Sequence, residues 1–329
     1  MFGNVTRVPD IVRYLQSEYK LCNLKVARFE SFSYFCSVIR DKVMKFVRTI
    51  QGYNHLWAVK EDGKETDELS MLFRQWSNFN YLLDFFFANM EDLQGFFKIE
   101  KISDAIKDTM EDAEELERLI LDFPYTEQLD GLFHPLSLGD NRAHELTREK
   151  ARNWDRKQHP SWLRIYAIRI EPNVYIVTGG AIKLTATMQE REHTQKELDK
   201  LNACREFLKQ NGVFDQDSFI DFFRGGVNMR KKTLNFLEAH LSDKPSTFTE
   251  EAKWRQENEV WLKWSRGIAL SIVDYMQENG LTRADIACKL GVTPQYVSKI
   301  LSGNTNFSFK SVAEIEQKLG ISCMEFAMA

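Results

Sequence analysis

Residues 281–321 read LTRADIACKLGVTPQYVSKILSGNTNFSFKSVAEIEQKLGI, and their spacing predicts short helices that pack on one another. Gly291 stands where the chain needs a left-handed turn, a conformation that only glycine adopts without strain. Thr293 is placed to cap the next helix, and Pro294 takes its first position, where a missing N–H leaves nothing unsatisfied. Gly303 is expected to end that helix. Apolar residues recur at helical spacing throughout the segment: Ile286, Ala287, Leu290, Val297, Ile300, Leu301, Val312, Ile315 and Leu319.

The helix that begins at Pro294 has a polar outer face. Because its apolar residues turn inward, Gln295, Tyr296, Ser298 and Lys299 are left pointing outward. A recognition helix in the major groove of DNA needs such a face, since glutamine suits adenine and lysine suits guanine or phosphate. A helical hairpin that binds nothing is the alternative. The cap, the turn glycine, the apolar period and the polar face agree with one another, and this agreement favours the DNA reader.

The same residues resemble the Xre/Cro-like repressor family along their whole length. The family pattern of Leu-Thr, two or three residues, Ile-Ala and then Lys-Leu-Gly-Val matches residues 281–292. With the apolar stripe that starts at Trp261, the resemblance implies an all-α helix-turn-helix domain over residues 261–329. It further implies which residues meet DNA. The expected contacts to bases or backbone are Thr293, Gln295, Ser298 and Lys299, and the expected phosphate contacts are in the loop around Asn304 and Asn306.

Composition sets limits on the rest of the chain. Its 329 residues are enough for two or three domains, and 43% hydrophobic with 28% charged residues is ordinary globular composition. The net charge of −4 argues against a protein that coats nucleic acid all over, but it allows a local basic face. The sequence has no apolar run long enough for a membrane helix and no export signal. Five scattered cysteines without ligand spacing predict neither disulfides nor structural zinc. We expect a cytoplasmic protein without a metal or cofactor.

The N-terminal region alternates between helical and strand-like patterns. Residues 1–43 match no pattern and are either an extension or a small helical cap, whereas Met44 resembles a natural start. A strand is expected at 55–60, followed by aromatic-rich helices from Leu69. Residues 91–130 carry thirteen acidic and four basic residues on an apolar stripe, which predicts an acidic amphipathic helix. Its acidic face is either solvated or provides electrostatic contacts to a partner.

A strand pair is expected next. Residues 161–170 alternate, with Leu163, Ile165 and Ala167 on one side, and residues 174–185 return after a turn at 171–173. Gly179 and its neighbour mark a bend or bulge, and a helix is expected over about 190–211. This pattern predicts an α+β N-terminal domain of helices and a small antiparallel sheet.

Residues 44–215 are similar to the RelE/ParE superfamily of bacterial toxins, and most of all to its HigB or Gp49-like members. The resemblance is carried by LRIYAIR at 163–169, GAIKLT at 180–185, then Arg191 and His193. The helical part before the sheet is longer than in small toxins, which leaves the substrate open. The resemblance implies ribosome-dependent mRNA cleavage without a metal, in which a 2′-hydroxyl attacks the adjacent phosphate. A base must take its proton, and cations must hold the developing charge.

The basic residues of this region are the candidates for that chemistry. Lys183 and Arg191 are the expected phosphate clamps, and His193 is the expected acid or base because its ordinary pKa lies near neutrality. Arg164 and Arg169 are further candidates, but they lie an odd number of residues apart, so a regular strand places them on opposite faces. Salt bridges with the acidic helix, or simple exposure on the surface, are the alternative roles. Motifs of hydrolases and nucleotide-binding proteins are absent from the sequence.

These patterns together predict a toxin and an antitoxin on one chain. Residues 44–215 would be the toxin, 216–260 a connector whose part 230–259 covers the toxin's active face, and 261–329 the antitoxin. The antitoxin would bind operator DNA as a homodimer and repress its own transcription, while the toxin would act on ribosome-bound mRNA when released. One alternative is a regulator without nuclease activity that senses a ligand or oligomerises through the aromatic stretch around Phe86. Another is a ParE-like gyrase inhibitor.

Overall fold

The computed structural model describes residues 44–126, 129–137, 146–155, 159–213 and 231–323. Contacts join the residues from 44 onward into one unit, and residues 1–43 lie outside the described residues. The two interpretations of residues 1–43 therefore stay predictions. So does the division of the chain at residues 215 and 260.

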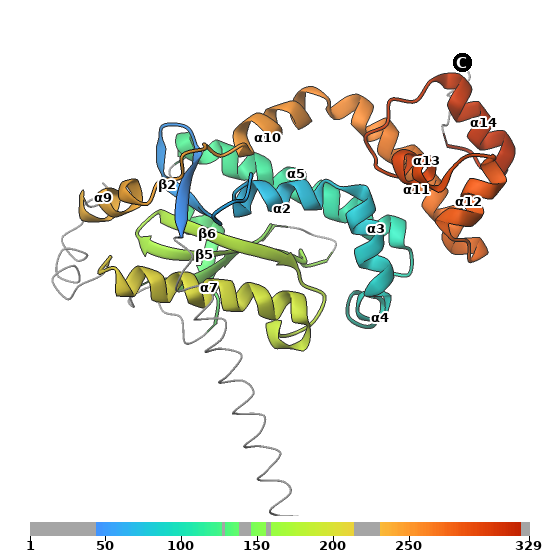
Figure 1. Ribbon diagram of the computed structural model, residues 1–329. Helices are drawn as coiled ribbons and strands as arrows, with labels where there is room; N and C mark the ends of the chain where they lie inside the picture. Colours follow the sequence, from blue (N-terminus) through green and yellow to red (C-terminus); the bar gives the residue numbers. More distant parts are fainter. Residues whose placement is uncertain (1–43, 127–128, 138–145, 156–158, 214–230, 324–329) are drawn as a thin grey trace, which may run out of the picture. The chain divides into compact units, whose positions relative to one another are not determined.

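A six-stranded sheet forms the centre of the N-terminal region, in the order β1-β2-β6-β5-β4-β3 (Figure 1). Its strands are β1 (Lys45–Ile50), β2 (Tyr53–Lys60), β3 (Phe133–Pro135), β4 (Thr147–Ala151), β5 (Leu163–Glu171) and β6 (Val174–Ile182). β2 and β6 run parallel, and all other neighbours are antiparallel. The α+β class is confirmed, but the prediction of a small antiparallel sheet is wrong. The β1–β2 hairpin joins the sheet through the parallel pair, which makes the sheet larger and mixed.

Helices cover both faces of the sheet. The first face carries α2 (Glu68–Trp76) and α5 (Ile102–Thr126), and the second carries α7 (Glu192–Gln210) (Figure 1). Along the chain, α2 is followed by α3 (Phe79–Ala88), α4 (Met90–Asp92) and the π-helical turn η1 (Leu93–Phe97) before α5 begins. The short helix α6 (Leu129–Leu132) precedes β3. The turn η2 (Met188–Glu190) leads into α7. Each face of the sheet therefore has a hydrophobic core of its own.

The alternation predicted for β5 is confirmed. Leu163, Ile165 and Ala167 lie in the larger core on the α2/α5 face, whereas Tyr166 and Ile168 lie in the smaller core on the α7 face. The predicted bulge is also present, because the β5–β6 register shifts between Tyr166 and its successor. Opposite this shift Gly179 has φ +153°, and a Cβ there would lie 1.9 Å from the Glu197 carboxylate on α7. Only glycine fits this position.

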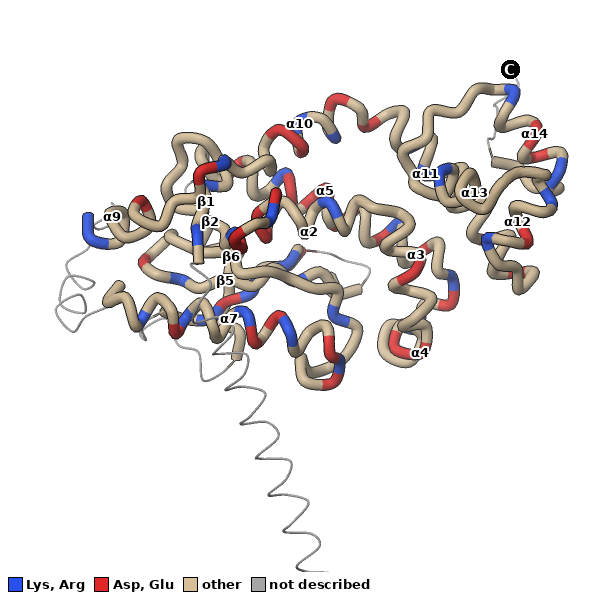
Figure 2. Tube along the Cα trace, in the orientation of Figure 1, with Lys and Arg blue, Asp and Glu red and all other residues tan. Residues whose placement is uncertain are grey.

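The predicted acidic amphipathic helix is α5. Its residues Met110, Ala113, Leu116 and Ile120 are buried, but Leu119, which was expected in the same stripe, is 39% exposed. Some of the acidic residues of α5 (red in Figure 2) contact other helices of the chain. Glu114 and Glu117 form ion pairs with arginines of the C-terminal helices, so partners within the same chain meet part of the acidic face.

The segment after residue 230 packs against the N-terminal region. α9 (Lys231–Ala239) buries Leu237 in the smaller core, and Phe46 of β1 forms a parallel bridge with Leu241. α10 (Phe248–Glu257) buries Phe248 against Phe73 of α2, with ring centroids 5.3 Å apart. The part of the expected connector that the structure describes is therefore a packed element.

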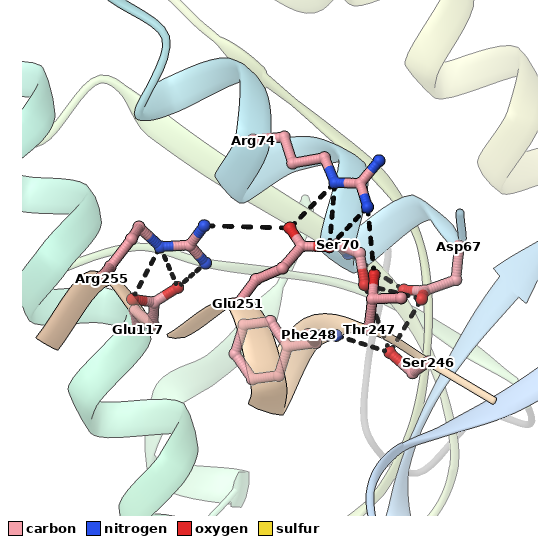
Figure 3. A network of polar contacts seen from close by, with 9 residues as sticks. All are labelled: Asp67, Ser70, Arg74, Glu117, Ser246, Thr247, Phe248, Glu251 and Arg255. Atoms are coloured by element: carbon pink, nitrogen blue, oxygen red, sulfur yellow. Dashed lines mark hydrogen bonds and ion pairs between the residues drawn. The ribbon is translucent and has the colours of Figure 1, made fainter. Parts of the chain in front are cut away.

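A polar network along α10 fixes this helix to α2 and α5 (Figure 3). The Asp67 carboxylate caps α2 and also accepts a hydrogen bond of 2.8 Å from the Ser246 hydroxyl. Arg74 of α2 donates two hydrogen bonds from Nε to Glu251, at 2.8 and 3.0 Å. Arg255 pairs with the buried Glu117 of α5. The contact expected between the two halves of the chain is thus made by α10 on α2 and α5.

Candidate nucleic-acid interfaces

Four helices form the C-terminal part: α11 (Glu259–Asn279), α12 (Arg283–Leu290), α13 (Pro294–Ile300) and α14 (Phe309–Leu319). A capping box between Thr282 and Asp285 starts α12. Gly291 ends α12 with φ +69°, and the Thr293 hydroxyl then accepts a hydrogen bond from the Tyr296 N–H at 3.2 Å, which starts α13. Gly303 has φ +70° in the loop after α13. These turns confirm the local predictions.

The inner faces of the four helices share one core. All the apolar residues that the sequence placed inside this segment are buried, among them Ile286, Val297 and Ile300 at 0% exposure. The apolar stripe that was predicted to start at Trp261 lies within α11 and is confirmed only in part. Ile268, Ile272, Val273 and Met276 are buried, but Trp264, in the first turns of the same helix, is 61% exposed.

The polar residues of α13 and the loop after it lie mostly at the surface. The exposed set comprises Thr293, Gln295, Tyr296, Lys299, Asn304 and Asn306. Ser298 differs, because it is half-buried and its backbone carbonyl accepts a 2.8 Å hydrogen bond from the Asn80 amide of α3. The loop is held in place by a hydrogen bond from the Thr305 N–H to the Ser265 hydroxyl at 2.9 Å. A rigid scaffold therefore presents the polar face that a major groove requires.

Residues 272–326 match the family model described as helix-turn-helix. These residues are a helix-turn-helix domain. The match supports the Xre/Cro-like prediction for this segment and suggests a DNA-binding transcription regulator. No curated protein and no solved structure matches the chain, so the RelE/HigB-like assignment of residues 44–215 stays a prediction. Among the helices that the structure describes, none has the length and apolar character needed to span a membrane.

A second candidate interface is a cavity of about 680 Å³ on the α7 face of the sheet. Cationic side chains dominate its polar lining. Arg148, Lys150 and Arg152 come from β4 and the residue after it, Arg164 comes from β5, and Lys183 follows β6. Side chains two residues apart on a strand share a face, and this is why Arg148 and Lys150 of β4, with Arg152 directly after it, lie on one wall.

The electrostatics of the cavity reflect the crowding of like charges. Burial, together with the neighbouring Arg152, lowers the pKa of Arg164 to about 10. Burial and then the charges of Arg164 and Lys150 also lower the pKa of Lys183. Both shifts mean that these side chains hold positive charge at a cost, which a bound anion would offset.

Two buried polar atoms of the cavity lining lack a hydrogen-bond partner among the residues that the structure describes. One is the Tyr166 hydroxyl, on a side chain that is 1% exposed, and the other is Nε of Arg152. The Arg152 guanidinium lies 4.2 Å from the centroid of the Trp154 ring. Buried polar groups normally find partners, and a phosphate oxygen would satisfy such donors.

The residues proposed for mRNA cleavage do not form one cluster. Arg164 and Lys183 line the cavity, but Arg169, Arg191 and His193 do not. Of the five candidates, the structure brings only these two together at the cavity. Whether any of them has a catalytic role stays a prediction.

Each residue outside the cavity has a partner of its own. Arg169 pairs with Asp130 at 3.1 Å, as the odd spacing from Arg164 allows, because the two arginines lie on opposite faces. Arg191 donates from Nε to Asp92 of α4 at 2.6 Å. His193 bonds through Nε2 to the Ile182 carbonyl at 3.0 Å. These contacts compete with any role at the cavity.

Arg148, Lys150 and Arg152 were missed from the sequence. The stretch TREKAR at 147–152 does carry a signal, because every second residue is a cation while Thr147, Glu149 and Ala151 are buried. Residues 231–259, which the structure describes, do not line this cavity. The expectation that residues 230–259 cover the toxin's active face stays a prediction.

Proposed function

We propose that this chain is an operator-binding repressor of its own gene, in which α13 enters the major groove. The carrying observation is the exposed polar face of α13 on a core fixed by the Thr293 cap and by Gly291. Gln295 and Lys299 lie four residues apart on this helix, so they address neighbouring base pairs on the same side. A single short recognition helix reads only a few base pairs. We therefore propose a homodimer on a two-fold-related operator.

Duplex binding by the full chain tests this proposal. The probe is the sequence immediately upstream of the coding region, with a scrambled duplex of equal composition as the reference. Gln295→Ala should weaken specific binding by about 1–3 kcal/mol and relax the preference at one position. Lys253→Ala, an exposed cation of α10, is the control for Lys299→Ala. Equal affinity for the two duplexes would rule out a sequence-reading function.

A second function is favoured by the cationic cavity, namely binding and cleavage of RNA as part of a toxin–antitoxin protein. Arg164 and Lys183 would hold the phosphate, supported by the cations of β4 and the hydroxyl of Tyr166. The 2′-oxygen forms a bond to phosphorus while the bond to the 5′-oxygen breaks, which leaves a 2′,3′-cyclic phosphate. The cations stabilise the negative charge on the phosphate in the transition state. His134 lines the cavity and replaces His193 as the group positioned to move the proton.

RNA binding and cleavage by cavity variants test this second function. Arg164→Ala and Lys183→Ala should each weaken binding of a single-stranded RNA oligonucleotide and slow the loss of ribosome-bound mRNA. Lys196→Ala removes an exposed cation of α7 outside the cavity and is the matched control. Equal losses in all three variants would mean that general charge accounts for binding. Inhibition of gyrase supercoiling, or tight binding of a small anion without RNA cleavage, would favour the alternatives of a gyrase inhibitor or a ligand-sensing regulator.

A further inference from the structure

Helix α3 of the N-terminal region lies directly against the helix-turn-helix. Phe79 packs at Gly303, where an added Cβ would approach the Phe79 Cβ to 3.2 Å. One residue later, Asn80 donates its hydrogen bond to the Ser298 carbonyl of α13. Asp84, a full turn further along α3, pairs with Arg283 at 2.7 Å. Three residues of α3 therefore contact the loop after α13, α13 itself and the start of α12.

Arg283 is the cation of the helix-turn-helix that pairs with α3. It is the first residue of α12, directly after the capping residue. Residues four apart on a helix are neighbours, about 5–6 Å between their Cβ atoms, so Asn80 and Asp84 lie side by side on α3. Because Asn80 contacts Ser298 of α13 and its neighbour Asp84 pairs with Arg283, we infer that Arg283 lies at the rim of the surface of α13 that faces DNA. A duplex seated on α13 brings its phosphates to the rim of this surface, where a guanidinium is a suitable partner.

In the DNA-free chain the Arg283 cation is held by Asp84. Its terminal nitrogen donates to the Asp84 carboxylate, and its buried Nε has no hydrogen-bond partner among the described residues. The Asp84 side chain is 65% exposed, so its charge is also open to an approaching duplex. One carboxylate therefore occupies a cation that phosphate could use and repels the phosphate itself.

We propose that α3 restrains DNA binding, because Asp84 and a DNA phosphate compete for Arg283. The proposal rests on the operator-binding function and adds a control built into the N-terminal region. Binding of a duplex exchanges the carboxylate for a phosphate on the same guanidinium. The hydrogen bond from Asn80 to Ser298 holds α3 in the position that makes this competition effective.

A double-mutant cycle in the full chain tests the competition. Asp84→Asn should bind the upstream duplex about fivefold more tightly, the upper range for loss of one exposed ion pair. Arg283→Gln should weaken binding and reduce the salt dependence of log K by about one phosphate contact. In the Arg283→Gln background, Asp84→Asn should change affinity less than about twofold, because the contested cation is gone. Asn80→Ala should also tighten binding, since it frees α3 without altering charge.

Controls separate this proposal from simple charge effects and from misfolding. Glu91→Gln removes an exposed acid of α4 and should leave affinity within about a factor of two, since distant surface charges are screened. Unchanged thermal midpoints would show that the variants fold. Equal gains in DNA affinity from Asp84→Asn with and without Arg283 would overturn the proposed competition. So would the absence of any gain from Asp84→Asn, or weaker DNA binding by the Asn80→Ala variant. The cycle can also be measured on the scrambled duplex, because phosphate contacts carry no sequence information. Failure of operator recognition is therefore distinguishable from failure of the restraint.

Discussion

Replacing Arg255 by methionine should destabilise the protein far more than loss of an ordinary surface charge. Arg255 of α10 donates from Nε to both Glu117 carboxylate oxygens at 3.1 and 3.2 Å, and the two side chains are only 11% and 4% exposed. Removing one partner of a buried pair leaves the other as an uncompensated charge, which costs about 3–5 kcal/mol. At about 2–4 °C per kcal/mol for a unit of this size, the midpoint should fall by roughly 6–20 °C.

The loss should depend on pH in a defined direction. Burial raises the pKa of Glu117 above its ordinary value, and Arg255 acts in the opposite direction. Without Arg255 the folded-state pKa rises further. A carboxyl with a raised folded-state pKa favours the protonated form in the folded protein. Its destabilising effect on the fold therefore grows as pH rises through the range between its unfolded-state pKa and its folded-state pKa. Arg255→Met should therefore approach wild-type stability near pH 4 and differ most at neutral pH.

Urea unfolding, followed by circular dichroism at several pH values, measures this effect. Lys101→Met is the matched control, because Lys101 pairs with Glu278 at the surface with both side chains more than half exposed. The control should lose at most about 1 kcal/mol. The double variant Glu117→Gln with Arg255→Met should recover much of the lost stability. A loss below 1 kcal/mol for Arg255→Met, or no recovery in the double variant, would refute the argument that α10 is fixed by a buried charge pair.

Three further perturbations address the fold and the DNA reader. Gly179→Ala should lower the free energy of unfolding in urea by at least about 1–3 kcal/mol, because the backbone there has φ +153° and a Cβ would meet an α7 carboxylate. The control Gly212→Ala, with open space around the residue, should cost about 1 kcal/mol. Ile286→Ala empties a fully buried position and should remove about 2–5 kcal/mol, with loss of duplex binding in an anisotropy titration. Burial opposes ionisation of Asp130, but hydrogen bonds led by the one from Arg169 hold the pKa of this carboxyl below its usual range. The ionised Asp130 therefore stabilises the fold above its unfolded-state pKa, and this stabilisation is lost as pH falls through the folded-state pKa. Arg169→Ala should consequently flatten the acid limb of a stability profile measured down to about pH 3, and an unchanged limb would count against the pair.

The helix-turn-helix was predictable because its determinants are local. Thr293 caps the helix that contains its own hydrogen-bond partner, and Gly291 adopts the left-handed conformation that its place between two helices requires. The alternation of β5 and the bulge near Gly179 are local in the same sense. Each of these features depends on residues within a few positions of one another, so a single sequence contains the whole argument.

The basic residues were harder to place because their partners come from distant parts of the chain. Arg191 is neutralised by Asp92, and Arg169 by Asp130, and neither acid lies near its arginine in sequence. The parity argument did separate Arg164 from Arg169 correctly. The parity argument could not reveal the cavity, because one wall of the cavity is formed by β4 and no strand was predicted there. The alternation of cations and buried residues along β4 is the signal that would have indicated it.

Net charge is a poor guide to DNA binding in this chain, because much of its acidity is paired within the fold. Glu114 of α5 pairs with Arg266 of α11, and Asp84 of α3 pairs with Arg283 of α12. The acids of the N-terminal region thus meet cations of the segment that carries the DNA reader. Such pairing has two opposite effects. It reduces the repulsion that the acidic surface exerts on a duplex, and it occupies cations that phosphate would otherwise attract. On the proposed function, we therefore expect DNA affinity to depend on how firmly α3 and α5 hold these arginines, which the overall count of charged residues does not describe.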